Sequence, residues 1–299
     1  MGGLTGLLAP GTGTALEHAI TPVLAALLFV TFLQVPVSSL GASLRAGRFI
    51  GAVLVVNFAV VPLVLAAVFA LLPADQAVRL GVLLVLLTPC VDYVIVFCGL
   101  AGGSARRLLA ATPLLLVAQM LLLPLLLLLF LGPDLADVVE PGPFVEAFIL
   151  LIALPLALAW LAQTWAARSD TGSRAAAAAG TTMVPLMAAT LFAVTASQVP
   201  ALGGDLGDVL AVAPFYAGFL IVMPFAGIAV ARLFALGAED TRAVVFTGAT
   251  RNSLVVLPLA LALPDAFAVA AVVVVAQTLV EVIGMVVYVR LIPRLVPRV

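Results

Sequence analysis

VVFTGATRNSLVVLPLALAL, residues 244–263, has the length and apolar character of a membrane-spanning helix. Its middle, however, is the polar run Gly-Ala-Thr-Arg-Asn-Ser at 248–253, which includes the full positive charge of Arg251. On insertion scales an arginine at the bilayer centre costs about 2.5–3.5 kcal/mol, and such residues usually face a cavity or a partner. The stretch therefore predicts a span with a polar break, and it raises the question of what Arg251 contacts there.

The composition of the whole chain is that of an integral membrane protein. Of its 299 residues, 65% are hydrophobic and 9% are charged, whereas soluble domains have about 45–50% and about 25%. The 13 basic residues are all arginines and form no cluster suited to nucleic acid. The sequence lacks a phosphate-binding Gly-x-x-x-x-Gly-Lys loop and any nucleophile–base or metal-ligand spacing. We therefore expect no enzymatic activity, no cofactor and no nucleic-acid partner, with a lipid bilayer as the surroundings.

Apolar segments long enough to cross the bilayer follow one another with short connections. Numbered one to nine, they are 18–37, 49–72, 77–101, 106–131, 143–166, 174–199, 206–234, 241–262 and 266–292. The pattern predicts an all-α integral membrane protein of about nine transmembrane helices, with residues 1–299 forming a single transporter unit.

The arginines are distributed asymmetrically between the two sets of loops. Eleven belong to one side: Arg45, Arg48, Arg106, Arg107, Arg168, Arg174, Arg232, Arg242, Arg290, Arg294 and Arg298. The other side has Arg79 among several acidic residues. Because arginine-rich loops stay in the cytoplasm, we expect a multi-pass cell-membrane protein with its N-terminus outside and its C-terminus in the cytoplasm.

Spans three and eight differ from the others because both have polar interruptions. Span three contains Thr88-Pro89-Cys90 and Asp92, and span eight is the opening stretch. Interrupted spans in corresponding positions of two halves point to the substrate site of an inverted-repeat transporter. The second interrupted span comes five spans after the first. Because each span crosses the membrane once, a repeat of five spans returns in the opposite orientation. The sequence thus predicts an inverted repeat whose two broken helices cross.

Several motifs, in order along the chain, resemble those of a known family. They are TFLQVPVSSL (31–40), RFIGAVLVVNFAVVPLV (48–64), PCVDYVIVFCGLAGG (89–103), FTGATRNS (246–253) and QTLVEV (277–282). Together they resemble the bile acid:sodium symporter superfamily, and within it the arsenical-resistance (arsenite efflux) permeases. The resemblance implies a core domain made of about 49–131 and 206–292, within which two broken helices cross. It also implies a panel domain made of about 18–37 and 143–199.

The resemblance to the sodium symporters fails at the sodium ligands. Their Ser-Asn pair aligns with Val94 and Ile95, their sodium-binding Glu with Thr247, and their Gln with Arg251. Val, Ile and Arg side chains offer no oxygen to a cation, so the arsenite permeases are the better match.

The arsenite permeases have a Cys at the position of Cys90, an Arg-Asn-Ser like Arg251–Ser253 and a Glu at the position of Glu281. A thiolate suits a soft centre such as As(III) or Sb(III), so Cys90 is a candidate metalloid ligand. The chain departs from that group in two places: Asp92 stands where the permeases have small or apolar residues, and Leu254-Val255-Val256 stands where many of them have a Glu.

These residues define a candidate site. Substrate binding is expected at Cys90, Asp92, Arg251, Asn252 and Ser253, with Asp92 and Glu281 as the proton-coupling carboxylates. We predict that Arg251 pairs with Asp92, because either charge alone is costly in the membrane. A purely structural ion pair is the alternative for Arg251, and a hydrogen bond to a neighbouring helix is the alternative for Glu281. Asn57 and Gln119 are expected to make interhelical hydrogen bonds.

The predicted function is proton-coupled efflux of arsenite or antimonite, so the substrate is a small molecule or metalloid oxyanion. The first alternative is bile acid:sodium symporter-type uptake of an organic anion. A second is a channel-like or scaffold protein that retains the fold without coupled transport. The apolar residues at the sodium-ligand positions disfavour the organic-anion symporter. The costly intramembrane charges disfavour the channel-like or scaffold protein.

Overall fold

The computed structural model describes residues 13–33, 47–91, 93–132 and 149–297, and its regular elements are helices. Four helices in these ranges are long and apolar enough to cross a membrane. They are Gly47–Phe69, Ala105–Leu131, Leu210–Leu233 and Val269–Leu295. They coincide with predicted spans two, four, seven and nine, so the all-helical class is confirmed.

Of the other predicted spans, three and eight are interrupted, span six continues into span seven through one long helix, and spans one and five are described only in part. The first half contains α2 (Gly13–Leu33), α4 (Gly47–Val55), η3 (Val56–Val60), α5 (Val61–Phe69), α6 (Gln76–Leu86), α7 (Tyr93–Leu100) and α8 (Ala105–Leu131). The second half contains η4 (Ile149–Ala153), α11 (Leu154–Ala166), α12 (Asp170–Thr181), α13 (Met183–Leu233), α14 (Ala238–Ala249), α15 (Ser253–Leu261), η5 (Asp265–Phe267) and α16 (Val269–Leu295).

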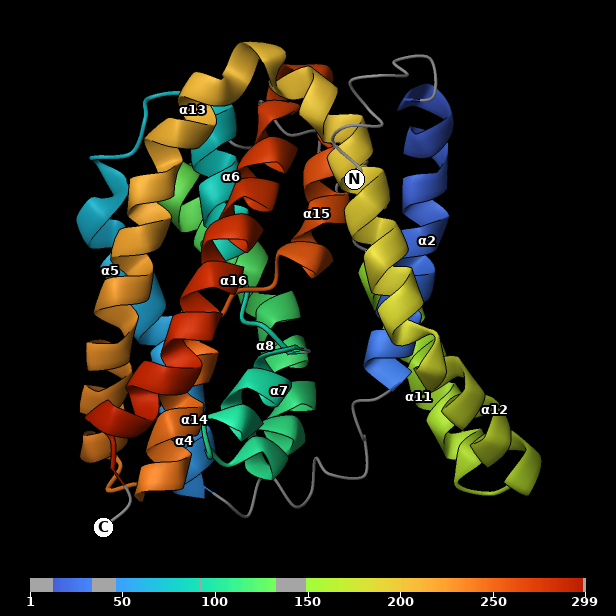
Figure 1. Cartoon of the computed structure of the whole chain (residues 1–299), viewed down its shortest axis with the longest axis vertical. Coiled ribbons are helices and arrows are strands. Elements are labelled where there is room, and N and C mark those ends of the chain that lie inside the picture. The colour runs from blue at the N-terminus through green and yellow to red at the C-terminus, as the bar shows by residue number, and fades with distance from the viewer. Residues whose placement is uncertain (1–12, 34–46, 92, 133–148, 298–299) are drawn as a thin grey trace.

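Helix α13 differs from the prediction, which placed a connection between spans six and seven. Its hydrogen-bonded backbone is continuous over 51 residues. The ribbon rises on one side, bends over the top and descends on the other (Figure 1). Pro200 lies in this continuous helix, and proline can bend a helix without ending it. The count of nine separate helices is therefore not confirmed, and the inverted repeat stays a prediction.

The described helices pack in two groups. Helix α2 packs against α11, α12 and α13. In Figure 1 the first, yellow part of α13 lies on the right with α2, α11 and α12, whereas its second part lies on the left. Helix α16 contacts α6, α7, α13 and α15, and α14 contacts α4, α7, α8 and α13. This grouping resembles the predicted panel and core, whose division into domains stays an interpretation.

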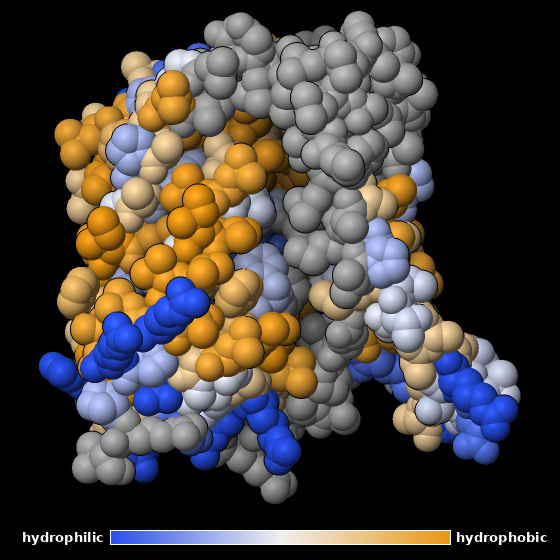
Figure 2. Space-filling model, viewed as in Figure 1, coloured by the Kyte–Doolittle hydropathy of each residue, from blue (hydrophilic) through white to orange (hydrophobic). Residues whose placement is uncertain are grey.

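The face drawn in Figure 2 is apolar over much of its described surface. Figure 2 shows apolar side chains across the central face, with strongly hydrophilic ones gathered toward the lower end, where the C-terminus lies in Figure 1. Large exposed side chains include Leu121 and Leu129 of α8, Ile221 of α13 and Ile283 of α16. Exposed apolar surface on this scale marks contact with a membrane. The chain is a multi-pass membrane protein.

Helices α6 and α16 meet at Gly81. A Cβ added there would lie 2.8 Å from the carbonyl oxygen of Ala270 and 3.0 Å from its Cα. We expect Gly81→Ala to destabilise the protein by about 1–3 kcal/mol, because the helices must separate. Gly218→Ala in α13 is the matched control, since an added Cβ meets nothing within 4 Å there. Thermal unfolding in detergent should show a lower midpoint for Gly81→Ala alone; equal midpoints would contradict the close contact.

Candidate functional site

The predicted breaks in spans three and eight are present and lie side by side. Helix α6 ends at Leu86 and α7 begins at Tyr93, while α14 ends at Ala249 and α15 begins at Ser253. Pro89 and Arg251 form an antiparallel bridge, and we call the place where the two breaks meet the crossing. Unpaired backbone groups are costly in a membrane, and the two breaks supply partners for each other. These bonds run from Cys90 N to Thr250 O (3.1 Å) and from Asn252 N to Thr88 O (2.9 Å).

Equivalent side chains close the helix ends at both breaks. The Thr88 hydroxyl donates to Leu84 O, and the Thr250 hydroxyl donates to Phe246 O, each at 2.8 Å. Asn252 Oδ1 accepts from the N–H of Val255 at 3.1 Å, as an N-cap does at the start of a helix. Local polar residues therefore satisfy the backbone groups that the breaks release.

The Arg251 side chain is wholly buried (0% exposed), and neutral oxygens surround its guanidinium. Nη2 donates to Asn57 Oδ1 (2.8 Å), Thr247 O (2.6 Å) and Gly248 O (2.7 Å), and Nη1 donates to Leu86 O (3.2 Å). We call these four oxygens the oxygen cage. The guanidinium carbon also lies 5.6 Å from the centre of the Phe219 ring, which suits a cation–π contact. The charge is thus stabilised from α4–α5, α6, α13 and α14.

The π-helix η3 positions Asn57 for this role. Pro62 has no backbone N–H to donate, and π-helical turns are often found at functional sites. Asn57 Nδ2 donates to Val53 O (2.9 Å) and to Thr247 Oγ1 (3.2 Å), so its Oδ1 is directed at Arg251. The predicted interhelical role of Asn57 is confirmed.

Glu281 of α16 is also wholly buried, and three donors surround its carboxylate. The backbone N–H of Arg251 donates to Oε2 at 2.8 Å. The Tyr93 hydroxyl donates to Oε1, and Gln277 Nε2 donates to Oε2. Arg251 therefore binds Glu281 through its main chain and the oxygen cage through its side chain. Within the described ranges, the one ion pair joins Arg107 and Asp240.

Three buried polar atoms at the crossing have no hydrogen-bond partner within the described part of the chain. They are Arg251 Nε, Asn252 Nδ2 and Gln277 Oε1. Leaving such a group unsatisfied costs about 1–3 kcal/mol, so two donors and one acceptor remain for a polar ligand or water. Gln119 Oε1 is likewise unsatisfied, and its predicted interhelical bond is not confirmed.

The structure brings most of the predicted site residues together. Cys90 (0% exposed), Arg251, Asn252 and Ser253 lie at the crossing, and Glu281 contacts it. Asp92 lies outside the described residues, so its pairing with Arg251 stays a prediction. No three His, Cys, Asp or Glu residues converge as a metal site in the part of the chain that the structure describes.

Sequence reasoning missed Tyr93, Gln277 and Phe219. Gln277 is four residues before Glu281, a spacing at which helical side chains meet, and that spacing could have revealed it. Tyr93 and Phe219 carry no local signal, because their partners are far away in the sequence.

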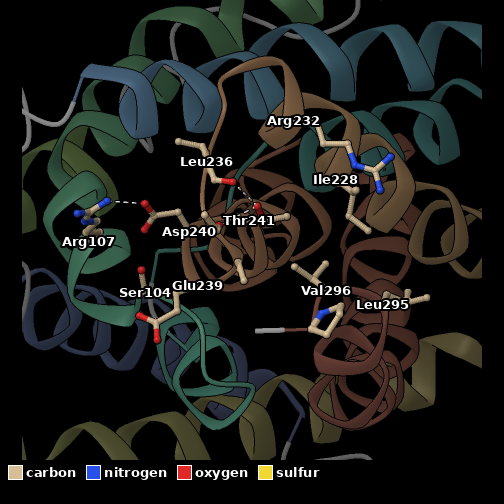
Figure 3. A pocket seen from close by; sticks show the side chains of 13 residues that line it. Ser104, Arg107, Ile228, Arg232, Leu236, Glu239, Asp240, Thr241, Leu295 and Val296 are labelled. Carbon is tan, nitrogen blue, oxygen red and sulfur yellow. Dashed lines mark hydrogen bonds and ion pairs between the residues drawn. The ribbon is translucent and has the colours of Figure 1, made fainter. Parts of the chain in front are cut away.

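A separate cavity of about 920 Å³ lies at the Arg-rich end. Figure 3 shows Arg107 pointing toward Asp240, with Glu239 and Ser104 nearby. Asp240 and Arg251 are 11 residues apart along the chain, about 16 Å of helix rise, and none of the crossing residues lines the cavity. It is therefore distinct from the crossing.

The buried Arg242 side chain links three segments of the chain. It donates to Ala101 O (3.0 Å), Gly102 O (3.1 Å) and Val296 O (2.9 Å). These bonds join the end of α7 and the C-terminal segment to α14.

Comparison with known proteins supports the resemblance at family level. Residues 6–295 match the SBF-like CPA transporter family. No match was found among curated proteins. The match covers nearly the whole chain and agrees with the bile acid:sodium symporter motifs, whereas it does not distinguish the arsenite permeases from other branches. The chain therefore belongs to the SBF-like CPA transporter family, a group of membrane transporters related to the bile acid:sodium symporters.

Proposed function

We propose that the protein is a proton-coupled secondary transporter that exports arsenite or antimonite across the cell membrane. The observation that supports proton coupling is the oxygen cage around Arg251. Oxygen atoms are the ligands that hard cations prefer, and here the protein's own guanidinium occupies them. Thr247, which aligns with the sodium-binding Glu of the symporters, gives its carbonyl to that guanidinium. A permanent cation would make bound sodium unnecessary.

Glu281 is the proposed proton carrier. Arginine keeps its proton throughout the working pH range, so a carboxylate must exchange it. Glu281 is in contact with both breaks, through the N–H of Arg251 and the hydroxyl of Tyr93. Its charge can therefore influence the crossing directly. Asp92 is the second proposed carrier.

Cys90 is the proposed metalloid ligand. Arsenous acid is a neutral trihydroxide near neutral pH, and a thiol can replace one hydroxyl. An As–S bond forms, an As–O bond breaks, and the hydroxide leaves with the thiol proton as water, without redox change. The remaining hydroxyls can accept from Arg251 Nε and Asn252 Nδ2 and donate to Gln277 Oε1, the unsatisfied atoms at the crossing.

Uptake of an organic anion is the second candidate, and the same unsatisfied atoms support it. Arg251 Nε and Asn252 Nδ2 are both donors, which suits a carboxylate or sulfonate. On this alternative Cys90 would be a buried packing residue, as most cysteines in apolar surroundings are.

Flux into inverted membrane vesicles would test these functions. Arsenite and taurocholate would be compared under separate proton and sodium gradients. We expect arsenite accumulation driven by a proton gradient and unaffected by sodium. Sodium-driven taurocholate movement would instead favour the organic-anion symporter, and absence of gradient-driven movement of either would contradict the proposed function.

The thiol of Cys90 provides a second test. We expect Cys90→Ser to lower arsenite efflux about 10-fold or more, because oxygen is a poorer ligand than sulfur for a soft metalloid. Cys98→Ser is the matched control, since Cys98 is equally buried but lies near the end of α7, against Gly103. Efflux in cells at equal protein levels is the measurement. Equal efflux by wild type and Cys90→Ser would remove the strongest reason for naming arsenite.

A further inference from the structure

The Tyr93 hydroxyl joins three elements at the crossing. Tyr93 is the first residue of α7, directly after the break in span three. Its hydroxyl donates to Glu281 Oε1 of α16 and also lies 3.1 Å from the carbonyl oxygen of Arg251, in the other break. Both neighbours are acceptors while Glu281 is ionised. A tyrosine hydroxyl has one proton, so it can donate to one of them at a time.

The charge of Glu281 decides which acceptor receives that proton. An ionised carboxylate is the stronger acceptor, because charge-assisted hydrogen bonds are about twice as strong as neutral ones. Tyr93 then donates to Glu281, and Arg251 O loses this donor. A protonated Glu281 is itself a donor, so it can donate to the Tyr93 oxygen while Tyr93 donates to Arg251 O. Protonation on α16 thereby creates a hydrogen bond between the two breaks.

In the described part of the chain the charged and titratable groups around this contact are the following, and Asp92, which precedes Tyr93 in the sequence, lies outside it. Arg251 faces Glu281 from the break between α14 and α15, Tyr93 faces it from α7, and Tyr288 lies on α16 itself. Cys90 lies in the break between α6 and α7, where its backbone N–H donates to Thr250 O, next to Arg251. Among these, Tyr93 is the group that contacts both Glu281 and the backbone of the opposite break.

We propose that Tyr93 is the positioning residue that transmits protonation of Glu281 to the two crossing breaks. The inference rests on the proposed proton coupling and adds the contact through which it acts. It implies that loss of one oxygen atom uncouples transport from the proton without removing the substrate site.

Tyr93→Phe tests this role, since it retains the ring and its edge-on contact with Phe97, whose centroid is 6.2 Å away. Tyr216→Phe is the matched control, because it removes another buried hydroxyl, which donates to Val273 O of α16 at 3.0 Å. In proteoliposomes we expect Tyr93→Phe to lower proton-driven arsenite transport about 10-fold while arsenite exchange at equal pH continues. A purely structural role would lower both equally and overturn the proposal, as would unchanged proton-driven transport.

Infrared difference spectra provide a readout that does not depend on the substrate. The carboxylic acid C=O band of Glu281 is identified by its loss in Glu281→Gln. In Tyr93→Phe this band should move to higher wavenumber, because the acid loses its hydrogen-bond partner, and in Tyr216→Phe it should stay in place. An unmoved band in Tyr93→Phe would overturn the proposal. A failure of the proposed transport function can be told apart from a failure of the Tyr93 proposal, because wild type itself would then show no proton-driven transport.

Discussion

Arg251→Gln should lower proton-driven transport at least about 100-fold. The substitution removes the permanent cation and leaves the cage oxygens of Thr247, Gly248 and Leu86 without their charged donor. Hydrogen bonds to charged groups contribute about 1.5–3 kcal/mol each, and every 1.4 kcal/mol is a factor of ten. Loss of two such bonds from the transport-competent state, about 3 kcal/mol in all, therefore lowers the transport rate about 100-fold. Initial rates in proteoliposomes under an imposed pH gradient are the measurement.

Arg79→Gln is the matched control for this substitution. Arg79 also donates to a carbonyl oxygen, that of Pro73 at 2.8 Å, and lies over an aromatic ring, Phe69 at 5.2 Å. It is at the start of α6, away from the crossing, so transport should stay near the wild-type rate. Normal transport by Arg251→Gln would show that Arg251 is merely structural.

The predicted Asp92 pairing can be tested with the same variants. If Asp92 forms an ion pair with Arg251, removal of one partner leaves an uncompensated buried charge, which destabilises the protein more than removal of both. Arg251→Gln combined with Asp92→Asn should then be better inserted and folded than Arg251→Gln alone. No difference in folded yield would contradict the pair.

Glu281→Gln should reduce proton-driven transport to the level of empty liposomes while substrate exchange continues. Glutamine has nearly the same shape: its single oxygen can still accept from the Arg251 N–H, and its NH2 can donate to the Tyr93 oxygen, as the protonated acid would. It resembles the protonated acid permanently, and a site that cannot bind and release a proton cannot use the proton gradient to shift a conformational equilibrium.

Counterflow at equal internal and external pH, compared with uptake under a pH gradient, separates the two activities. Glu239→Gln is the control, because Glu239 lines the cavity at the Arg-rich end and not the crossing. Wild-type proton-driven transport by Glu281→Gln would exclude Glu281 as the carrier.

The sequence alone determined the class of protein and the places where its helices break. Composition identifies a membrane protein because the bilayer demands apolar residues. The breaks at Pro89 and at Thr250–Asn252 could be predicted because proline and polar residues interrupt an apolar span locally. Local patterns placed a connection between spans six and seven, where α13 is continuous, because a proline can bend a helix without ending it.

The tertiary structure alone decided what surrounds the buried charges. Asn57 and Arg251 are 194 residues apart, and Tyr93 and Glu281 are 188 apart. No local periodicity relates such residues, because their contacts arise when separate helices pack together. The sequence predicted that Arg251 needs a partner, since an unpaired charge is costly in a membrane. Only the packing of α4–α5, α6 and α14 around the crossing revealed a cage of neutral oxygens, with Glu281 bound to the main chain of the same residue.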